Sequence, residues 1–306
     1  MEVLQLEDLM IENKVQTILT EAKLDWSIDK IQLTGVHNEK IINSGYVGLV
    51  NSKTQKVLHA AKPSYTPCQN DELVRILMKG SQAFGNLKYN WGGAMNGGKK
   101  IFLNLKIADA YSVRGEELKR YVTGINSNDG SAAVSFGYGN TVPSCDNQFR
   151  KFLRERFHKI YHNSSMDEKL EQVPEILYHI LEEELQLMKI YSELAETNIS
   201  KDLANDLVKS LIGYDRTATK EELEDMGIKQ RSLNIMNSLH NAIDFEIKDK
   251  GENMWGLFNG VTRFTTHDKS VPKRSFGREE SLYFGSGATM NNDALQFVMK
   301  EAELTF

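Results

Sequence analysis

Positively charged side chains interleaved with aromatic rings are the residues of this chain best suited to bind a ligand. Residues 150–159 read RKFLRERFHK and carry five Lys or Arg against one Glu. Residues 269–278 form a second basic stretch around Phe276, with no helical period that would make its charges a solvated face. Proteins hold single-stranded nucleic acid by cations on phosphates and by rings under bases. The candidate phosphate contacts are Arg150, Lys151, Arg154, Lys273, Arg274 and Arg278.

The first basic stretch also has a simpler interpretation. On a helix over residues 148–162, the rings of Phe149, Phe152 and Phe157 would form the buried face, and the cations would form the wet face. The second stretch reads as a loop, in which the same interpretation does not apply. We therefore expect the loop that carries Phe276 to be the better contact for a polyanion.

A glycine-rich segment, residues 92–98, supplies two further cations. Residues 93–99 fit the phosphate-binding pattern GxxxxGK, but Lys100 stands where a Ser or Thr would ligate magnesium. The residues that follow, IFLNLKI, read as a strand, whereas a phosphate cradle needs the free amides of a helix N-terminus. We predict a hairpin tip with Lys99 and Lys100 as phosphate contacts and Trp91 as a second ring for stacking on bases.

The chain has no set of residues with the spacing of a catalytic site. His158 and His162 lie four residues apart, a spacing that can hold zinc, but no carboxylate or Cys completes the set. Two surface histidines on a basic helix are the simpler interpretation. Residues 144–146 (SCD) lack the surroundings of a nucleophile, and Glu182–Glu184 read as a solvated helix face. We expect no enzymatic activity, no metal and no cofactor.

Residues 251–267 carry two stripes at helical spacing, one apolar and one of a different kind. The second stripe holds Trp255, Asn259 and Thr262, where a solvated face would carry Lys and Glu. We interpret this helix as a buried strut, with Trp255 as its anchor and the two polar side chains bonded to nearby backbone. Its end at His267 would position the basic loop that follows.

The elements that must position these residues are strands in the first half of the chain. A helix is predicted over 4–22, a strand over 24–34, and a hairpin over 46–50 and 56–60. A helix over 71–84 precedes a second hairpin over 87–91 and 99–107. A third pair, 121–126 and 132–138, is joined by Asn128, Asp129 and Gly130, a strong turn signal.

Helices dominate after residue 147. Besides 148–162, they are expected over 167–195 with Pro174 near the first turn, 200–212 ending at Gly213, 229–247, 252–267 and 291–303, with a capping box at Thr219 and Glu222 opening a short one. The prediction is an α+β fold: an antiparallel β-rich region with one packed helix over 1–147, and a helical region over 148–306 packed on it, or one continuous domain.

Several motifs resemble those of the phage- and plasmid-encoded domain of unknown function 932. Residues 254–267 (MWGLFNGVTRFTTH) resemble its W-G-x-x-N-x-V-T-x-x-x-x-H core, and residues 278–287 (REESLYFGSG) its closing segment. Residues 97–102 (GGKKIF) and 144–147 (SCDN) resemble two further steps of the family. Residues 126–131 (NSNDGS) resemble its N-S-H-D-G-S turn, with Asn128 in place of the usual His. The resemblance covers most of the chain and implies a mobile-element setting but no reaction.

The order of elements over residues 24–84 is similar to the core of phage single-strand annealing proteins, which carry DNA in a basic groove and form rings. We therefore expect a nucleic-acid-binding protein, a single-strand DNA annealing or recombination factor that forms homo-oligomers. The alternative is a non-enzymatic protein that binds and inhibits a host factor through the Trp-Asn-Thr stripe and the acidic helix. The net charge of −5 excludes neither, because the local field decides. Two cysteines and no long apolar run predict a cytoplasmic protein without membrane contact.

Overall fold

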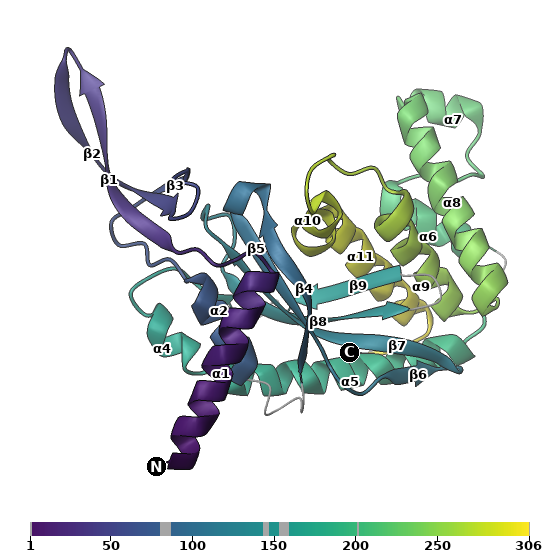
Figure 1. The fold of residues 1–306 in the computed structure, drawn as a ribbon. Coiled ribbons are helices and arrows are strands. Elements are labelled where there is room, and N and C mark those ends of the chain that lie inside the picture. Colours follow the sequence, from purple (N-terminus) through teal and green to yellow (C-terminus); the bar gives the residue numbers. More distant parts are fainter. Residues whose placement is uncertain (1, 80–86, 143–146, 153–158, 201, 306) are drawn as a thin grey trace.

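The computed structural model describes residues 2–79, 87–142, 147–152, 159–200 and 202–305. The fold is α+β, as predicted: antiparallel sheets from the first half of the chain are covered by helices, most of which come from the second half (Figure 1). Two sheets are present in the described residues, and they have different roles.

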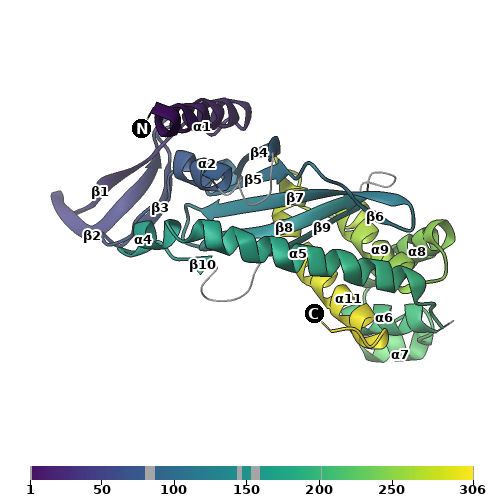
Figure 2. The ribbon, with the colours of Figure 1, turned by 90° about the horizontal axis from the view of Figure 1, so that it is seen from below.

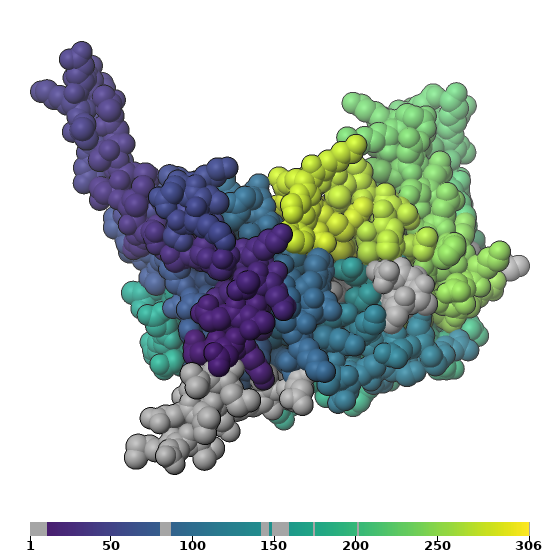
Figure 3. Space-filling model, in the orientation of Figure 1, coloured from purple at the N-terminus to yellow at the C-terminus, as the bar shows by residue number. Residues whose placement is uncertain are grey.

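The N-terminal sheet ends in a projecting arm. Strands β1 (Ile28–His37), β2 (Lys40–Asn51) and β3 (Val57–Ala61) pair antiparallel in that order. Asn38 and Glu39 have φ of 47° and 62° and form the two-residue turn between β1 and β2, a geometry that matches the twist of paired strands. Because β3 pairs with β2 only from Val47 onwards, residues 33–46 stand clear of the molecule (Figures 1 and 3). We call residues 33–46 the arm.

The second sheet carries the main core. Its order is β10-β8-β7-β5-β4, with β9 also beside β8 and β6 beside β7, and every pair is antiparallel. Side chains alternate between the two faces of a strand. On β5, Ile101 and Leu103 therefore join the main core, whereas Phe102 points to the opposite face. The strands are β4 (Lys88–Met95), β5 (Lys100–Lys106), β6 (Tyr111–Val113), β7 (Glu116–Ser127), β8 (Val134–Val142), β9 (Asn147–Phe152) and β10 (Lys159–Ile160).

Helices cover the main-core face of this sheet. The long helix α5 (Val173–Glu196) runs along the sheet, and α1 (Glu2–Glu21), α2 (Asn70–Lys79) and α4 (Met166–Leu170) lie toward one end (Figure 2). Helix α2 packs closely on β7: a Cβ atom added at Gly124 would lie only 2.8 Å from the Leu77 side chain. In the described residues, side chains from these helices and from the strands therefore pack together on this face as the main core.

The C-terminal helices form the other end of the molecule, and α10 packs on the second face of the sheet (Figure 1). Helices α8 and α9 cross so closely that a Cβ atom at Gly260 would lie 2.4 Å from the Cα of Ile243. Helix α9 continues into one π-helical turn, Phe264–Asp268, which ends where the basic loop begins. The helices are α6 (Leu203–Ile212), α7 (Lys220–Asp225), α8 (Gln230–Lys250), α9 (Met254–Arg263), α10 (Gly277–Phe284) and α11 (Ser286–Glu301).

Several predicted elements are confirmed and others are wrong. Gly213, with φ of 88°, ends α6, and Thr219 and Glu222 form the capping box of α7. The predicted helix over 148–162 is wrong, because β9 and β10 complete the open edge of β8 through backbone hydrogen bonds. The predicted helix over 167–195 is two helices, and the second begins with Pro174 in its first turn. Helix α10 was predicted as the end of a loop.

Candidate functional site

Aromatic rings gather where the β4–β5 hairpin meets α10, on the sheet face opposite the main core. Phe102 of β5 lies at the centre and is fully buried. Its ring centroid lies 5.0 Å from Trp91 of β4, 5.1 Å from Phe276 before α10 and 5.2 Å from Tyr283 of α10. The Trp91 and Phe276 rings lie 6.4 Å apart and are both half-buried. Rings from two distant segments are thus brought to one place with part of each open to solvent.

Local backbone geometry fixes this arrangement. Phe276 has φ of 56°, a conformation that turns the loop sharply into α10. Its ring lies directly over Gly93, where an added Cβ atom would approach the ring to 2.9 Å. Gly277 is equally constrained, since a Cβ atom there would lie 2.3 Å from the Pro272 carbonyl oxygen. The glycine-rich segment therefore serves packing within β4 as well as the turn of the hairpin.

Two predicted cations join the rings. The Lys100 ammonium lies 4.9 Å from the centroid of the Phe284 ring and 3.4 Å from one carboxylate oxygen of Glu280. Arg274 forms an ion pair with the other oxygen of the same carboxylate. A cavity of about 240 Å³ is lined by Lys100, Arg274, Glu280 and Phe284, together with the start of α11. We call Trp91, Lys100, Arg274, Phe276 and Glu280 the basic–aromatic cluster.

Arg278, itself predicted as a phosphate contact, makes hydrogen bonds within the chain. Its guanidinium donates hydrogen bonds to the carbonyl oxygens of Thr265 at 2.8 Å, Lys269 at 2.6 Å and His267 at 3.1 Å. Burial lowers the pKa of Arg278, and burial together with the nearby Arg278 charge lowers the pKa of Lys269. Arg278 thus ties α10 to the end of the π-helical turn and fixes the loop between them.

The N-S-N-D-G-S turn at residues 126–131 is hydrogen-bonded to the tip of the neighbouring β4–β5 hairpin. The Asn128 side chain donates to the Gly98 carbonyl at 2.9 Å, and its backbone amide donates to the Lys99 carbonyl at 2.7 Å. Burial of Asp129 opposes its ionisation, yet hydrogen bonds from Ser131 and Ser127 lower its pKa overall. The turn therefore holds Lys99 and Lys100 in place through backbone contacts rather than presenting a reactive group.

The polar stripe of α9 lies inside the protein. Trp255, Asn259 and Thr262 are all buried, and the last two donate to the carbonyls of Trp255 and Asn259 at 2.9 Å and 3.0 Å. Asn147 of β9 donates to the Asn259 carbonyl at 3.3 Å, so this hydrogen bond also connects α9 to the sheet. The end at His267 leads directly into the loop that carries Phe276. The stripe is thus a packing surface within the chain and is not exposed to a partner.

The other predicted cations lie elsewhere. Arg150 and Lys151 are on β9, opposite Gly139 and Tyr138 of β8, and two strands, β8 and β7, separate β9 from β5, about 14 Å across the sheet. They are not part of the basic–aromatic cluster. Arg154, His158 and the SCD segment at 144–146 lie outside the described residues.

His162 is not the surface histidine that the helical interpretation predicted. Its ring stacks on Tyr65 with the centroids 4.8 Å apart. Its Nδ1 lies 3.1 Å from the Thr66 carbonyl oxygen, which fixes the proton on that nitrogen. Burial lowers the pKa of the imidazole, because the charged form is poorly solvated there. In the described residues, no group of three or more His, Cys, Asp or Glu side chains is placed to hold a metal ion.

Two important carboxylates were not found from the sequence. Glu280 of the basic–aromatic cluster lies in the first turn of α10, a helix that the sequence did not predict. Glu184, predicted to be solvated, is instead fully buried on α5, where it pairs with the buried Arg120 of β7 through both carboxylate oxygens. Glu184 could not be identified from the sequence because Glu182 and Glu183 precede it, and no neighbouring residue indicates which of the three carboxylates is buried.

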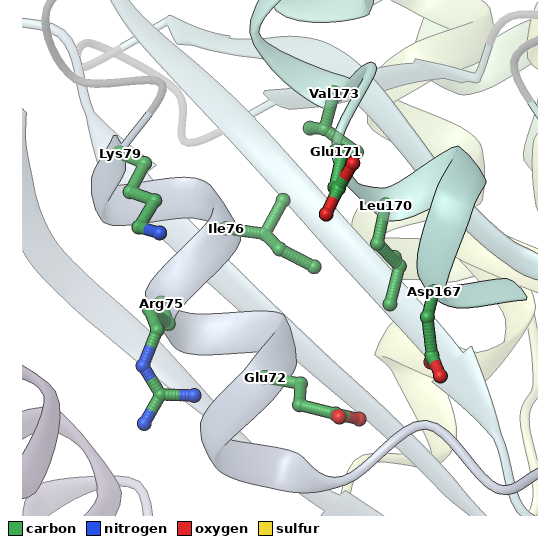
Figure 4. Close-up of a pocket in the computed structure, with 8 residues that line it drawn as sticks. All are labelled: Glu72, Arg75, Ile76, Lys79, Asp167, Leu170, Glu171 and Val173. Atoms are coloured by element: carbon green, nitrogen blue, oxygen red, sulfur yellow. The ribbon is translucent and has the colours of Figure 1, made fainter.

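One mostly apolar cleft is not suited to an anion. It has a volume of about 430 Å³ and lies between α2 and the start of α5, with Ile76 extending from α2 into it (Figure 4). Its wall carries acidic and basic side chains together. Arg75 is already paired with Glu12 of α1 at 2.7 Å, and burial raises the pKa of Glu72. The basic–aromatic cluster is therefore the better candidate for a ligand.

Comparison with known proteins gives one result. A family described as Domain of unknown function (DUF932) matches residues 57–293. The match begins at β3 and ends in α11, so α1 and the arm precede it. No curated protein and no solved structure shows a significant match. Among the helices of the described residues, none is long and apolar enough to cross a membrane.

Proposed function

Because the chain belongs to the family described as Domain of unknown function (DUF932), a description that states no activity, we propose from its own residues that it binds single-stranded nucleic acid. It would act as a homo-oligomeric annealing or recombination factor of a phage or plasmid, in the cytoplasm of the host cell. One observation carries the proposal: Trp91 and Phe276 lie 6.4 Å apart, beside the cations Lys100 and Arg274.

This combination suits a single strand for two reasons. Both ring residues are half-buried, so each is partly open to solvent, and stacking of a base on an aromatic ring contributes roughly 1–3 kcal/mol whatever the sequence. The cations beside the rings attract the phosphates, and each phosphate contact adds about −0.7 to the slope of log affinity against log salt. Lys99 at the hairpin tip and Lys273 in the loop before α10 add two positive charges to the chain segments that carry the rings. Binding should therefore be tolerant of sequence and sensitive to salt.

The test is fluorescence anisotropy with a labelled 20-nucleotide oligo(dT) over a range of sodium chloride concentrations. The variant Lys99→Gln/Lys273→Gln should bind more weakly, with a salt slope reduced in magnitude by about 1.4. The matched control is Lys220→Gln/Lys300→Gln, which removes two exposed lysines from α7 and the end of α11. Absent or salt-independent binding would overturn the proposal, as would an equal loss in the control.

The arm supports the oligomeric part of the proposal. Val36 and Ile41 pair across its two strands and are each 77% exposed. Exposed apolar side chains on a free two-stranded ribbon are typical of a surface that another chain covers. Light scattering after gel filtration should give an oligomer for the wild type and a smaller species for Val36→Ser/Ile41→Ser. A monomeric wild type would refute self-association.

The same exposed arm favours the second candidate function, binding of a host protein. Nuclease-treated capture from host lysate distinguishes the two candidates. A monomeric protein that binds no oligonucleotide, but retains one host protein through Val36 and Ile41, would replace the proposal by this candidate. Since the Trp-Asn-Thr stripe is buried, the arm is the surface to which this candidate now points.

A further inference from the structure

The Glu280 carboxylate bridges two cations at the wall of a cavity. One of its oxygens lies 3.4 Å from the Lys100 ammonium, and the other pairs with Arg274. The side chains of Lys100 and Glu280 keep only 15% and 17% of their surface exposed, so solvent screens this contact poorly. The carboxylate is an internal anion that holds together a lysine and an arginine from segments of the chain far apart in sequence.

The surroundings favour more negative charge than Glu280 supplies. The charged side chains that line the cavity of about 240 Å³ are two cations, Lys100 and Arg274, and one carboxylate, Glu280, which leaves a net positive charge at its wall. Gly285 and Ser286 also line this cavity; they are the N-cap and the first residue of α11, a helix of 16 residues without a side-chain cap at its start. Because α10 ends at Gly285, where α11 begins, the dipoles of the two helix ends oppose each other, and the attraction of an anion rests on the two cations.

A phosphodiester group matches the position of the carboxylate. It carries one negative charge on two non-bridging oxygens, and each oxygen can accept from one of two cations, as the oxygens of Glu280 do. We propose that the cavity is a phosphate subsite of the nucleic-acid interface, in which Glu280 holds the place of the phosphate in the free protein and competes with it. This inference rests on the proposed function and assigns Glu280 a regulatory part in it.

The discriminating variant is Glu280→Gln. It keeps the shape of the side chain and removes the competing charge, so both cations become available to phosphate. Affinity for the 20-nucleotide oligo(dT) should rise about tenfold at low salt, with a salt slope steeper by about 1.4. Adding Lys100→Gln or Arg274→Gln should abolish the gain. An oligonucleotide with uncharged methylphosphonate linkages should show no gain, because it offers the same bases without the anion.

The matched control is Glu279→Gln. Glu279 is the neighbouring carboxylate on α10, and its charge acts on Arg278. A gain for Glu280→Gln that exceeds that for Glu279→Gln supports the subsite. Equal effects, or weaker binding by a folded Glu280→Gln protein, would overturn it and leave the proposed function standing.

Two further outcomes complete the test. Failure of every variant and the wild type to bind would refute the proposed function itself. If circular dichroism shows that Glu280→Gln does not fold, Arg274→Gln on the exposed loop decides the question. That variant should weaken binding of oligo(dT) severalfold and leave binding of the methylphosphonate oligonucleotide unchanged, and an unchanged affinity for both would overturn the subsite.

Discussion

Replacement of Gly260 by alanine tests the packing that supports the basic loop. An added Cβ atom would lie 2.4 Å from the Cα of Ile243, about 1 Å short of the 3.4 Å at which ordinary contacts begin. The obstacle is the backbone of α8 rather than a flexible side chain. Helices α8 and α9 must therefore separate along their crossing, which also disturbs the buried Trp255 and Asn259.

Two opposing effects set the size of the change. Alanine is favoured over glycine in a helix interior by about 1 kcal/mol. Overpacking of a tight contact costs about 1–3 kcal/mol, and more where the backbone must move. Because the clash at Gly260 is with backbone, we expect the second effect to exceed the first. Gly260→Ala should lower the free energy of unfolding by about 2 kcal/mol.

Urea unfolding followed by circular dichroism measures this loss. The matched control is Gly35→Ala in the arm, where the nearest atom to an added Cβ is Ile42 Cγ1 at 3.8 Å, an ordinary contact. That substitution should be neutral or stabilising by up to about 1 kcal/mol. An unchanged or raised stability of Gly260→Ala would refute the close crossing of α8 and α9, since helix propensity would then be the dominant effect.

Two buried groups give further predictions for the same titration. Glu184→Gln should cost about 3–5 kcal/mol, because it leaves the buried Arg120 guanidinium without its counter-charge; Arg120→Met/Glu184→Leu should recover most of this, and no recovery would contradict the pairing. His240 is buried, which lowers its pKa, so between pH 7.5 and 5.5 the unfolded chain takes up a proton near pH 6.5 that the folded protein does not. The free energy of unfolding is therefore highest above pH 6.5 and decreases as the pH falls. The His240→Gln protein should lose less stability than the wild type between pH 7.5 and 5.5. An equal loss in the two proteins would show that His240 is not the cause.

Local signals in the sequence were sufficient for part of the fold. The capping box at Thr219, the stop at Gly213 and the turn at Asn128 to Gly130 are each specified by neighbouring residues, so they were predicted correctly. The strand β9 was not, because residues 148–152 alternate too irregularly to distinguish a strand from a helix. What decides it is the open edge of β8, which lies elsewhere in the chain.

For the candidate site, too, the residue types could be predicted from the sequence, whereas their arrangement in space could not. Lys100, Arg274 and the two rings were chosen by residue type, and the structure places these four together. Their convergence could not be predicted, because it depends on α10 lying over β5. Helix α10 was not predicted because its N-cap residue, Phe276, has a left-handed backbone conformation and provides no side-chain cap. Glu280 was missed for the same reason, although it contacts both cations.

The long span between the two halves of the basic–aromatic cluster also governs when the site forms during synthesis. Lys100 and Glu280 are 180 residues apart, and Asn104, which donates to the Tyr283 hydroxyl at 2.7 Å, is 179 residues from it. Strands β4, β5, β7 and β8 are neighbours in sequence and can pair as they leave the ribosome. At roughly 5–20 residues per second, the part of the chain that carries α10 follows Lys100 by roughly 9–36 s. During that interval the nascent protein has its sheet but not its site, and the ring of Phe102 stays exposed until the C-terminal helices arrive to cover it.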